Sequence, residues 1–399
     1  MSTTGETVTA DVVVVGLGGL GSASAYWLAR AGVSVVGLEQ FELGHVRGAS
    51  HDHSRIIRRS YHTPTYVELT AGAYDAWTEV ERDSGQQVIT RTGGIDLFPA
   101  DAAIDPTTYR ESLDAVGVPH EWLDAGEVRR RWPAFDRGTM VAGDVHALFS
   151  AETGIVPAGP GTALLQRMAV EHGARLIDRS PVRSIDPSGG EVVIVADGLT
   201  VRAGAVIVCA DAWTNRLLAP LGHRVSMAVT REQVSYFPTA DRDDLAVGRF
   251  PVWIWMDDPS FYGFPLFGPP DVVERLKGSE DCGGPEVDPD TRTFEPDLAM
   301  EQRLGRFMAD LLGDRFGVPS TTTCLYTLTA DRDFVVDRLP DHPHVCVGLG
   351  AAHGFKFASW FGRTLAELAR GTTPGPELAD FAIDRPALTA PPDRRAWLV

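Results

Sequence analysis

The apolar positions near the N-terminus alternate between short continuous runs and a helical spacing. Residues 11–15 have the pattern of a buried strand, the segment that follows to about Ala31 has the pattern of a helix, and residues 33–38 form a second apolar run. Strands that alternate with helices in this way predict a parallel sheet with helices packed on its faces. The N-terminal part of the chain is therefore expected to be α/β.

The middle of the chain follows a different pattern. Residues 228–238 and 251–267 alternate between apolar and polar side chains as sheet strands do, with a turn at Asp258-Pro259. Residues 295–313 have the spacing of an amphipathic helix. We expect an α/β fold in which a second, α+β domain carries a mixed sheet.

Composition restricts the class of protein further. The 399 residues are 44% hydrophobic and 23% charged, as is usual for globular enzymes, and the net charge of −18 argues against nucleic acid or an anionic membrane as the partner. No run approaches the ~20 apolar residues of a spanning helix, and the N-terminus lacks the pattern of a signal peptide. The four cysteines form no CxxC pair, so we expect a cytoplasmic protein and no metal site.

The first strand runs into a glycine-rich turn with the spacing of a dinucleotide fingerprint. Gly16 is expected to make the tight turn, Gly18 to let the backbone approach a pyrophosphate, and Gly21 to let the helix pack closely on the strand. Glu39 ends the second strand, where its carboxylate can bind ribose hydroxyls. These residues predict a dinucleotide site but leave FAD and NAD both open.

A long cationic loop follows Glu39, which is unusual for a nicotinamide enzyme. Between residues 45 and 59 it carries His45, Arg47, His51, His53, Arg55, Arg58 and Arg59. Arg55 and Arg58 are three residues apart, so one helical turn would place both on the same face. The alternative is a solvated basic patch, but the two isoleucines between these arginines favour a segment packed against the body of the protein.

Only two of the 36 lysine and arginine side chains are lysine, namely Lys277 and Lys356. A solvated surface accepts either cation, whereas a site that needs a compact, deprotonatable ammonium accepts only lysine. Lys356 lies at the start of a helix expected over 355–370, whose N-terminal dipole could face the pyrimidine end of a flavin. Composition therefore marks both lysines as candidates for function, with a surface loop as the alternative for Lys277.

Three segments, GASHDHSRIIR, TTTCLYT and HGFKF, resemble the monomeric sarcosine oxidase and N-methyltryptophan oxidase family of flavoprotein amine oxidases. The resemblance runs nearly end to end and implies a cofactor, FAD, attached covalently through Cys324. Cys209 and Cys346 lie in apolar runs and are expected to be core residues, and Cys282 is interpreted as incidental.

The same resemblance implies roles for individual side chains. Arg58 and Lys356 would bind a substrate carboxylate, since two cations converging on one carboxylate each give a charge-assisted hydrogen bond. Lys277 would assist the reaction with oxygen near the flavin, with Arg55 and His51 close to the ring as further catalytic residues. The remaining expectations are that Tyr262 and Tyr326 line the substrate cavity and that the cofactor also contacts Ser54, Asp211, Gly350, His353 and Gly354.

The chain departs from the family pattern in three places. Asp281 stands where a histidine is usual, and a carboxylate there would repel an acidic substrate or pair with its amine. The link that precedes Lys277 is about four residues longer than usual. Asp211 stands where a glycine is typical, although aspartate tolerates left-handed backbone better than most residues.

The expected organisation is a Rossmann-like FAD-binding domain interleaved with a substrate domain. The FAD-binding domain is expected to comprise 1–88, 145–220 and 320–385, the substrate domain 89–144 and 221–319, and the tail 386–399. We expect a monomeric oxidase that acts with oxygen on a small secondary amine bearing a carboxylate, such as an N-methyl or cyclic amino acid. A flavin dehydrogenase with another acceptor and a non-catalytic flavin-binding protein remain alternatives, and a nicotinamide dehydrogenase is the least favoured.

Overall fold

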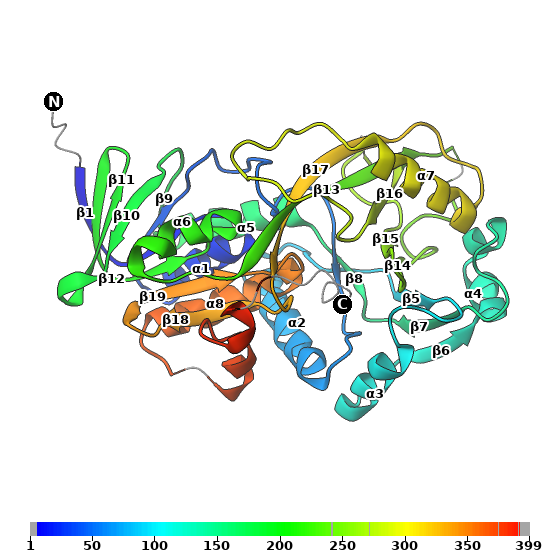
Figure 1. Ribbon diagram of the computed structural model, residues 1–399, viewed down its shortest axis with the longest axis horizontal. Coiled ribbons are helices and arrows are strands. Elements are labelled where there is room, and N and C mark those ends of the chain that lie inside the picture. Colours follow the sequence, from blue (N-terminus) through cyan, green and yellow to red (C-terminus); the bar gives the residue numbers. More distant parts are fainter. Residues whose placement is uncertain (1–5, 241, 271, 374, 390, 392–399) are drawn as a thin grey trace.

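Two large sheets lie at opposite ends of the molecule, with helices between and around them (Figure 1). The structure, a computed structural model, describes residues 6–389 and 391 except 241, 271 and 374. Most of the predicted tail, residues 390 and 392–399, lies outside the described residues, and its first part forms a short 3₁₀ turn at Pro386–Thr389.

The first sheet has a parallel centre, as the sequence predicts. Its strand order is β10-β11-β12-β1-β2-β9, with β19 pairing to the second half of β12 and β18 pairing to β19. β1 is parallel to both β12 and β2. The strands are β1 (Glu6–Val15), β2 (Val35–Leu38), β9 (Arg175–Ile177), β10 (Val182–Asp186), β11 (Val192–Ala196), β12 (Leu199–Val208), β18 (Val335–Leu339) and β19 (His342–Leu349).

The strand β1 is buried on both faces, which explains its continuous apolar run. Val12 and Val14 pack into the core beneath the helices, whereas Val13 and Val15 face a second core on the other side of the sheet, because strand side chains alternate. The first core includes residues of the helices α1 (Gly19–Arg30), α2 (Pro64–Ser84), α5 (Ala158–Glu171) and α8 (Ala358–Ala369).

The second sheet is mixed and has the strand order β17-β13-β16-β15-β14-β5-β7-β6. A third, small sheet has the order β3-β8-β4. In the sequence, β3 and β4 lie between β2 of the first sheet and β5 of the second, and β8 lies between β7 of the second and β9 of the first. The strands of the second and third sheets are β3 (Arg55–Ile57), β4 (Thr90–Arg91), β5 (Gly94–Phe98), β6 (Glu121–Asp124), β7 (His146–Ser150), β8 (Gly154–Val156), β13 (Met227–Pro238), β14 (Val252–Trp255), β15 (Phe261–Gly263), β16 (Arg275–Glu280) and β17 (Ser320–Thr329). Helices α4 (Ala125–Arg131) and α7 (Leu298–Leu312) pack in the core of this second sheet. Helix α3 (Pro106–Val116) packs on α2, and α6 (Thr214–Leu218) packs against the first sheet.

Most predicted elements are present, with two corrections. The segment that carries Arg55 and Arg58 does not form a helical turn: Arg55–Ile57 is the extended strand β3, since its β-branched residues pair antiparallel with β8. The helix expected over 355–370 begins later. Gly354–Phe357 is a 3₁₀ turn, a common tightening at helix ends, and α8 follows it at Ala358.

The strands of the first sheet all come from the ranges expected to bind FAD. Two strands from those ranges, β7 and β17, instead pair in the second sheet. The division into an FAD-binding domain and a substrate domain therefore stays a proposal, with β7 and β17 as the segments shared between them. Among the described residues, no helix combines the length and the apolar character that crossing a membrane requires.

Candidate active site

The glycine-rich turn has the geometry that a dinucleotide fingerprint requires. Gly16 has a φ of +88°, and a Cβ there would lie 2.4 Å from the carbonyl oxygen of Cys209. A Cβ on Gly21 would lie 1.8 Å from the carbonyl oxygen of Gly16, so α1 could not approach the strand with any larger residue. Gly18 is the N-cap residue of α1, and the amide of Gly19 donates a hydrogen bond of 2.9 Å to the hydroxyl of Ser50. Gly18 and Ser50 both line the adjoining cavity, so this helix N-terminus suits a phosphate group.

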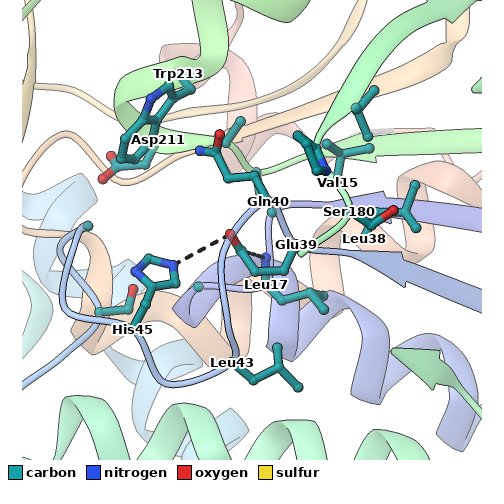
Figure 2. Close-up of a pocket in the computed structure, with 18 of the residues that line it drawn as sticks. Val15, Leu17, Leu38, Glu39, Gln40, Leu43, His45, Ser180, Asp211 and Trp213 are labelled. Carbon is teal, nitrogen blue, oxygen red and sulfur yellow. Dashed lines mark hydrogen bonds and ion pairs between the residues drawn. The ribbon is translucent and has the colours of Figure 1, made fainter. Parts of the chain in front are cut away.

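Glu39 lies at the end of β2 with its carboxylate beside this turn (Figure 2). Its Oε2 accepts a hydrogen bond of 2.8 Å from the amide of Leu17, and its Oε1 accepts one of 3.1 Å from the amide of Phe41. His45 Nε2 lies 3.5 Å from Oε1. Burial would raise the pKa of Glu39, but the hydrogen bonds from His45 and from the two amides lower it below its usual value, so the group is an anion that can accept ribose hydroxyls.

Three cavities form one path from the glycine turn towards the second sheet. We call them the nucleotide cavity, which Gly16 and Glu39 line, the connecting cavity, which Gly350 and Gly354 line, and the cationic cavity, which Lys356 lines. The first two share Gly18, Ala49, Ser50, Cys209 and Asp211, and the last two share Arg55, Tyr326, Ala352 and Phe355. An elongated path of this kind, with glycines that carry no side chain at one end, fits an extended dinucleotide such as FAD.

Arg58 and Lys356 both line the cationic cavity, and both lie near the ring of Tyr61, a buried residue outside that lining. The guanidinium carbon of Arg58 lies 4.9 Å from the ring centroid of Tyr61, and Lys356 Nζ lies 5.6 Å from the same centroid. Arg58 also pairs with Asp96 at 3.5 Å, and Lys356 donates a hydrogen bond of 2.9 Å to the carbonyl of His353. The structure thus brings together the two cations that the sequence assigned to a carboxylate.

The surroundings of Lys356 disfavour the charged form of its side chain. Burial is the main cause, and the charge of Arg58 acts in the same direction, so the pKa of Lys356 falls well below its usual value, while Asp281 opposes the fall. His353, which also lines this cavity, has its pKa lowered for the same reason, burial followed by the charge of Lys356, and is therefore neutral. A carboxylate bound in the cavity would raise the pKa of Lys356 and restore its charge.

Asp281 lines the cationic cavity beside Arg332, a residue that the sequence analysis did not single out. Asp281 Oδ2 lies 3.8 Å from Arg332 Nη2, and Arg332 Nη1 donates to the sulfur of Cys282 at 2.7 Å. Cys282, interpreted as incidental, thus helps to hold an arginine in the site. The carboxylate of Asp281 is engaged by a cation of the protein before any substrate amine is bound.

Lys277 lies apart from these cations, in β16, and is 3% exposed. Its Nζ is 2.7 Å from Asp52 Oδ2 and donates to the carbonyl and the hydroxyl of Ser54 at 2.9 and 3.0 Å. Burial lowers the pKa of Lys277 to about 8, although the charge of Asp52 opposes the fall. The hydroxyl of Tyr236 donates to the other oxygen of Asp52, so this carboxylate is fixed from two sides.

The strand β17 carries two of the predicted residues on one face. Cys324 and Tyr326 are two positions apart, so their side chains point in the same direction. Tyr326 lines the connecting and cationic cavities, and its hydroxyl lies 3.3 Å from that of Tyr262. Burial raises the pKa of the Cys324 thiol to about 11, whereas the charges of Arg55 and Lys277 act in the opposite direction.

The remaining predicted residues lie around this path. Arg55 lines the connecting and cationic cavities, pairs with Asp52 at 3.4 Å and donates to the carbonyl of Ser54 at 2.8 Å. Asp211 borders the nucleotide and connecting cavities with a φ of +44°, the left-handed backbone expected where a glycine is typical. His51 instead lines a neighbouring outer cavity together with Asp52, and burial lowers its pKa to about 4.

Three charged residues of the site were missed from the sequence. Asp52 is the single acidic residue between residues 43 and 61, a segment rich in basic residues. That contrast could have marked it as the partner of a cation. Asp96 interrupts the apolar run of β5, and an acidic residue in a buried strand is also informative. Arg332 lies in a turn rich in charges and carries no comparable signal. In the described part of the chain, no group of three or more His, Cys, Asp and Glu side chains could hold a metal ion.

Comparisons with known proteins identify the family of this chain. Residues 11–368 match the family described as DAO, FAD dependent oxidoreductase. The monomeric sarcosine oxidase of Streptomyces avermitilis is 35% identical over 92% of this chain and 96% of that protein. The N-methyl-L-tryptophan oxidase of Salmonella agona is 27% identical over 94% of this chain and 98% of that protein. Among solved structures, the open form of NikD, an unusual amino acid oxidase essential for nikkomycin biosynthesis, superposes with a TM-score of 0.84 at 26% identity, covering 94% of this chain and 97% of that one. The chain therefore belongs to the DAO family of FAD dependent oxidoreductases, within the group that contains the monomeric sarcosine oxidases and N-methyltryptophan oxidases.

Proposed function

We propose that this enzyme is an FAD-dependent oxidase of a secondary amine that bears a carboxylate, such as an N-methyl or cyclic amino acid. The observation that carries this proposal is the convergence of Arg58 and Lys356 on Tyr61, in a cavity that shares residues with the path leading to the dinucleotide turn. Two buried cations that line one cavity suit a carboxylate, and a flavin bound in the adjoining cavities would suit oxidation of the carbon next to nitrogen.

The side chains of the cavity would bind the substrate and select its reactive form. When bound, FAD would supply the oxidant: the carbon beside the amine would lose a hydride equivalent to give an imine, and oxygen would take up the two electrons and two protons to give hydrogen peroxide. Arg58 and Lys356 hold the carboxylate and thereby orient that carbon. The positive charge of the cavity disfavours a protonated amine, so the bound substrate is held as the neutral amine that can be oxidised.

Lys277 is assigned to the reaction with oxygen. Its ammonium is held by Asp52 and Ser54, in contact with the ring of Phe264 at 4.6 Å and next to Arg55. A fixed cation in a dry site stabilises negative charge that develops on oxygen as it is reduced. Asp52 acts as a positioning residue because its charge keeps Lys277 protonated despite burial.

We infer that the flavin is covalent and that Cys324 forms the link. The support is the place of Cys324 on the same face of β17 as Tyr326, a residue that lines the cavity path. Acid precipitation of purified protein should then leave the yellow colour in the pellet. The Cys324→Ser variant should release the colour into the supernatant, and colour retained by that variant would exclude this cysteine.

The main experiment is a peroxide-coupled screen of N-alkylated and cyclic amino acids with the purified yellow protein, paired with anaerobic bleaching of the flavin. Bleaching together with peroxide supports the oxidase. Bleaching without peroxide under air would instead identify a dehydrogenase that uses another acceptor. A flavin that no amine of the panel bleaches would contradict the proposed function and favour a non-catalytic flavin-binding protein.

The enzyme is further proposed to be a monomer of the cytoplasm. The names of relatives such as the monomeric sarcosine oxidase of Streptomyces avermitilis support the first part. The four cysteines, all free in the structure, support a reducing compartment. Light scattering on the eluted holoenzyme should give the mass of a single chain, and a dimer mass would contradict the monomer.

A further inference from the structure

Residues 288–294 form an irregular loop, which we call the strap, and both of its ends are fixed to the second sheet. Before the strap, the amide of Val287 donates a hydrogen bond of 2.9 Å to the carbonyl of Val229 in β13. After it, the side chain of Gln233 in the same strand bonds to both the amide and the carbonyl of Asp297. Because both ends are held close together on one strand, the segment between them projects from the sheet as a loop.

One contact of the strap is with the segment that follows β12. The carboxylate of Asp290 accepts a hydrogen bond of 2.7 Å from the indole nitrogen of Trp213, and it pairs with Arg216. Trp213 and Arg216 both line the nucleotide cavity, whereas Asp290 does not. The strap is therefore attached to one wall of the cofactor site from outside.

A second contact of the strap is with the segment that follows β2. Arg292 donates hydrogen bonds of 3.3 and 3.0 Å to the carbonyls of Val46 and Arg47. It also donates one of 3.0 Å to the hydroxyl of Thr323 in β17. The residues directly before and after the pair at 46 and 47 line the nucleotide cavity. The strap thus bridges two segments that both contribute to the cofactor site.

Arg292 makes this bridge costly to open. It is 7% exposed, whereas its neighbours in the strap lie mostly at the surface. Within the part of the chain that the structure describes, it forms no ion pair with a carboxylate, and its partners are the three oxygens and the ring of Phe294, whose centroid lies 4.1 Å from the guanidinium carbon. A buried charge is unfavourable without partners. Drawing the segment after β2 away from the strap would remove two of them, which favours the closed arrangement.

We propose that the strap retains FAD: it holds the segments after β12 and β2 together around the bound cofactor, and its opening limits the rate at which FAD leaves. The two segments reach the cavity from different sides, as Trp213 and His45 show (Figure 2). Asp290 and Arg292 are then positioning residues, because each contacts a wall of the site without lining it. The inference rests on binding of FAD and not on the proposed substrate, so it can fail while the proposed oxidase function stands.

The test measures how fast FAD leaves the holoenzyme. All proteins compared carry Cys324→Ser, so that a covalent bond to that cysteine cannot mask dissociation. Release is followed by the rise in flavin fluorescence after dilution to a concentration at which rebinding is negligible. The measurement needs no substrate, and its outcome is therefore separate from that of the activity screen.

Arg292→Met should raise the dissociation rate constant about tenfold or more, as expected for the loss of a charged hydrogen bond. Arg292→Lys keeps the charge but lacks the fork that reaches both segments, so it should recover only part of this effect. Asp290→Ala should raise the rate constant about fivefold, since it removes the hydrogen bond to Trp213 and an ion pair that is exposed. Arg303→Met is the matched control: this arginine pairs with Glu280 outside the nucleotide cavity and should leave the rate constant unchanged.

Combining Asp290→Ala with Arg292→Met distinguishes a strap from two separate weakenings of the site. A strap opens when either end is released, so the double variant should lose FAD at about the sum of the two single-variant rate constants. Independent local effects multiply instead, and a double variant that reaches the product of the two fold-changes would overturn the proposal. Unchanged dissociation in both single variants would overturn it as well. If Arg292→Met fails to fold, judged by thermal unfolding, Arg292→Lys takes its place in the same comparison.

Discussion

Lys277 and Lys356 are both almost fully buried, yet the two regions that hold them provide opposite surroundings. Lys277 lies in β16 with a carboxylate, Asp52, 2.7 Å from its Nζ. Within the described residues, no carboxylate lies within 4 Å of Lys356 Nζ, which donates instead to the carbonyl of His353 in the turn before α8. Burial lowers both pKa values, but the partner of Lys277 limits the fall to about 8.

The difference distinguishes two uses of the same side chain. A buried ammonium with its own counter-ion stays charged whether or not a ligand is present, which suits a group that must meet a neutral molecule such as oxygen. A buried ammonium without one has a lowered pKa that a bound carboxylate would raise again, which suits a group that must recognise an acid. Three substitutions test whether the two regions are independent in this way.

The largest expected effect comes from Lys277→Met. Loss of the cation should slow the reaction of the reduced flavin with oxygen by about 100-fold, in the range seen when a preorganised electrostatic group is removed. Anaerobic reduction by substrate should be unchanged, because Lys277 lies outside the lining of the cationic cavity. Stopped-flow absorbance measures both half-reactions. Lys277→Arg keeps the charge and should be slowed less, and normal reoxidation of the methionine variant would remove the assigned role.

Lys356→Met should act on the other half of the reaction. Loss of a charged hydrogen bond of about 1.5–3 kcal/mol raises the substrate Kd by about tenfold or more, while reoxidation stays as it was. A carboxylate ligand that has no ionisable amine should also take up a proton on binding to the unchanged enzyme, since it raises the lowered pKa of Lys356 and releases no proton of its own. Proton uptake is measured with an indicator dye in weak buffer. An unaltered Kd in the variant would contradict the carboxylate assignment.

The smallest expected effect concerns the pH profile of reoxidation. The ammonium form of Lys277 exists below its pKa of about 8, so the rate constant with oxygen should fall as pH rises through that value. Asp52→Asn removes the charge that raises this pKa, and the midpoint should therefore move to lower pH, with a change of a few-fold at pH 7.

Tyr236→Phe is the matched control for this prediction, because it removes one hydrogen bond of Asp52 but keeps the ion pair with Lys277. Its profile should stay close to that of the unchanged enzyme. A midpoint for Asp52→Asn that equals the original one would show that Asp52 does not govern the protonation of Lys277.

The parts of the site that sequence predicts well are those made by one continuous segment. Gly16, Gly21 and Glu39 lie within one stretch of 24 residues, so strand, turn and helix can be inferred together, although the carbonyl of Cys209 that approaches Gly16 comes from a distant segment. The fold of the first sheet follows from the same local pattern. The resemblance to a known family supplied the convergence of Arg58 and Lys356, which are nearly 300 residues apart and which no local pattern connects.

The parts that could not be predicted depend on contacts between distant segments. The pairing of Asp52 with Lys277 joins a loop after β2 to a strand of the second sheet. Arg332 enters the site because a single left-handed residue turns its side chain inward, and backbone conformation of that kind leaves no periodic trace in sequence. The extended conformation of Arg55–Ile57 likewise depends on pairing with a distant strand, β8. The local spacing of Arg55 and Arg58 therefore suggested a helical turn instead.

The pairing of β17 has a further consequence. This strand lies in unbroken antiparallel register with β13 from Ser320 to Thr329, and it carries Cys324 and Tyr326 two positions apart. A slip of one residue would turn both side chains to the opposite side of the sheet at once. The proposed attachment point of the flavin, Cys324, and a wall of the cationic cavity, Tyr326, are therefore fixed by the same strand register.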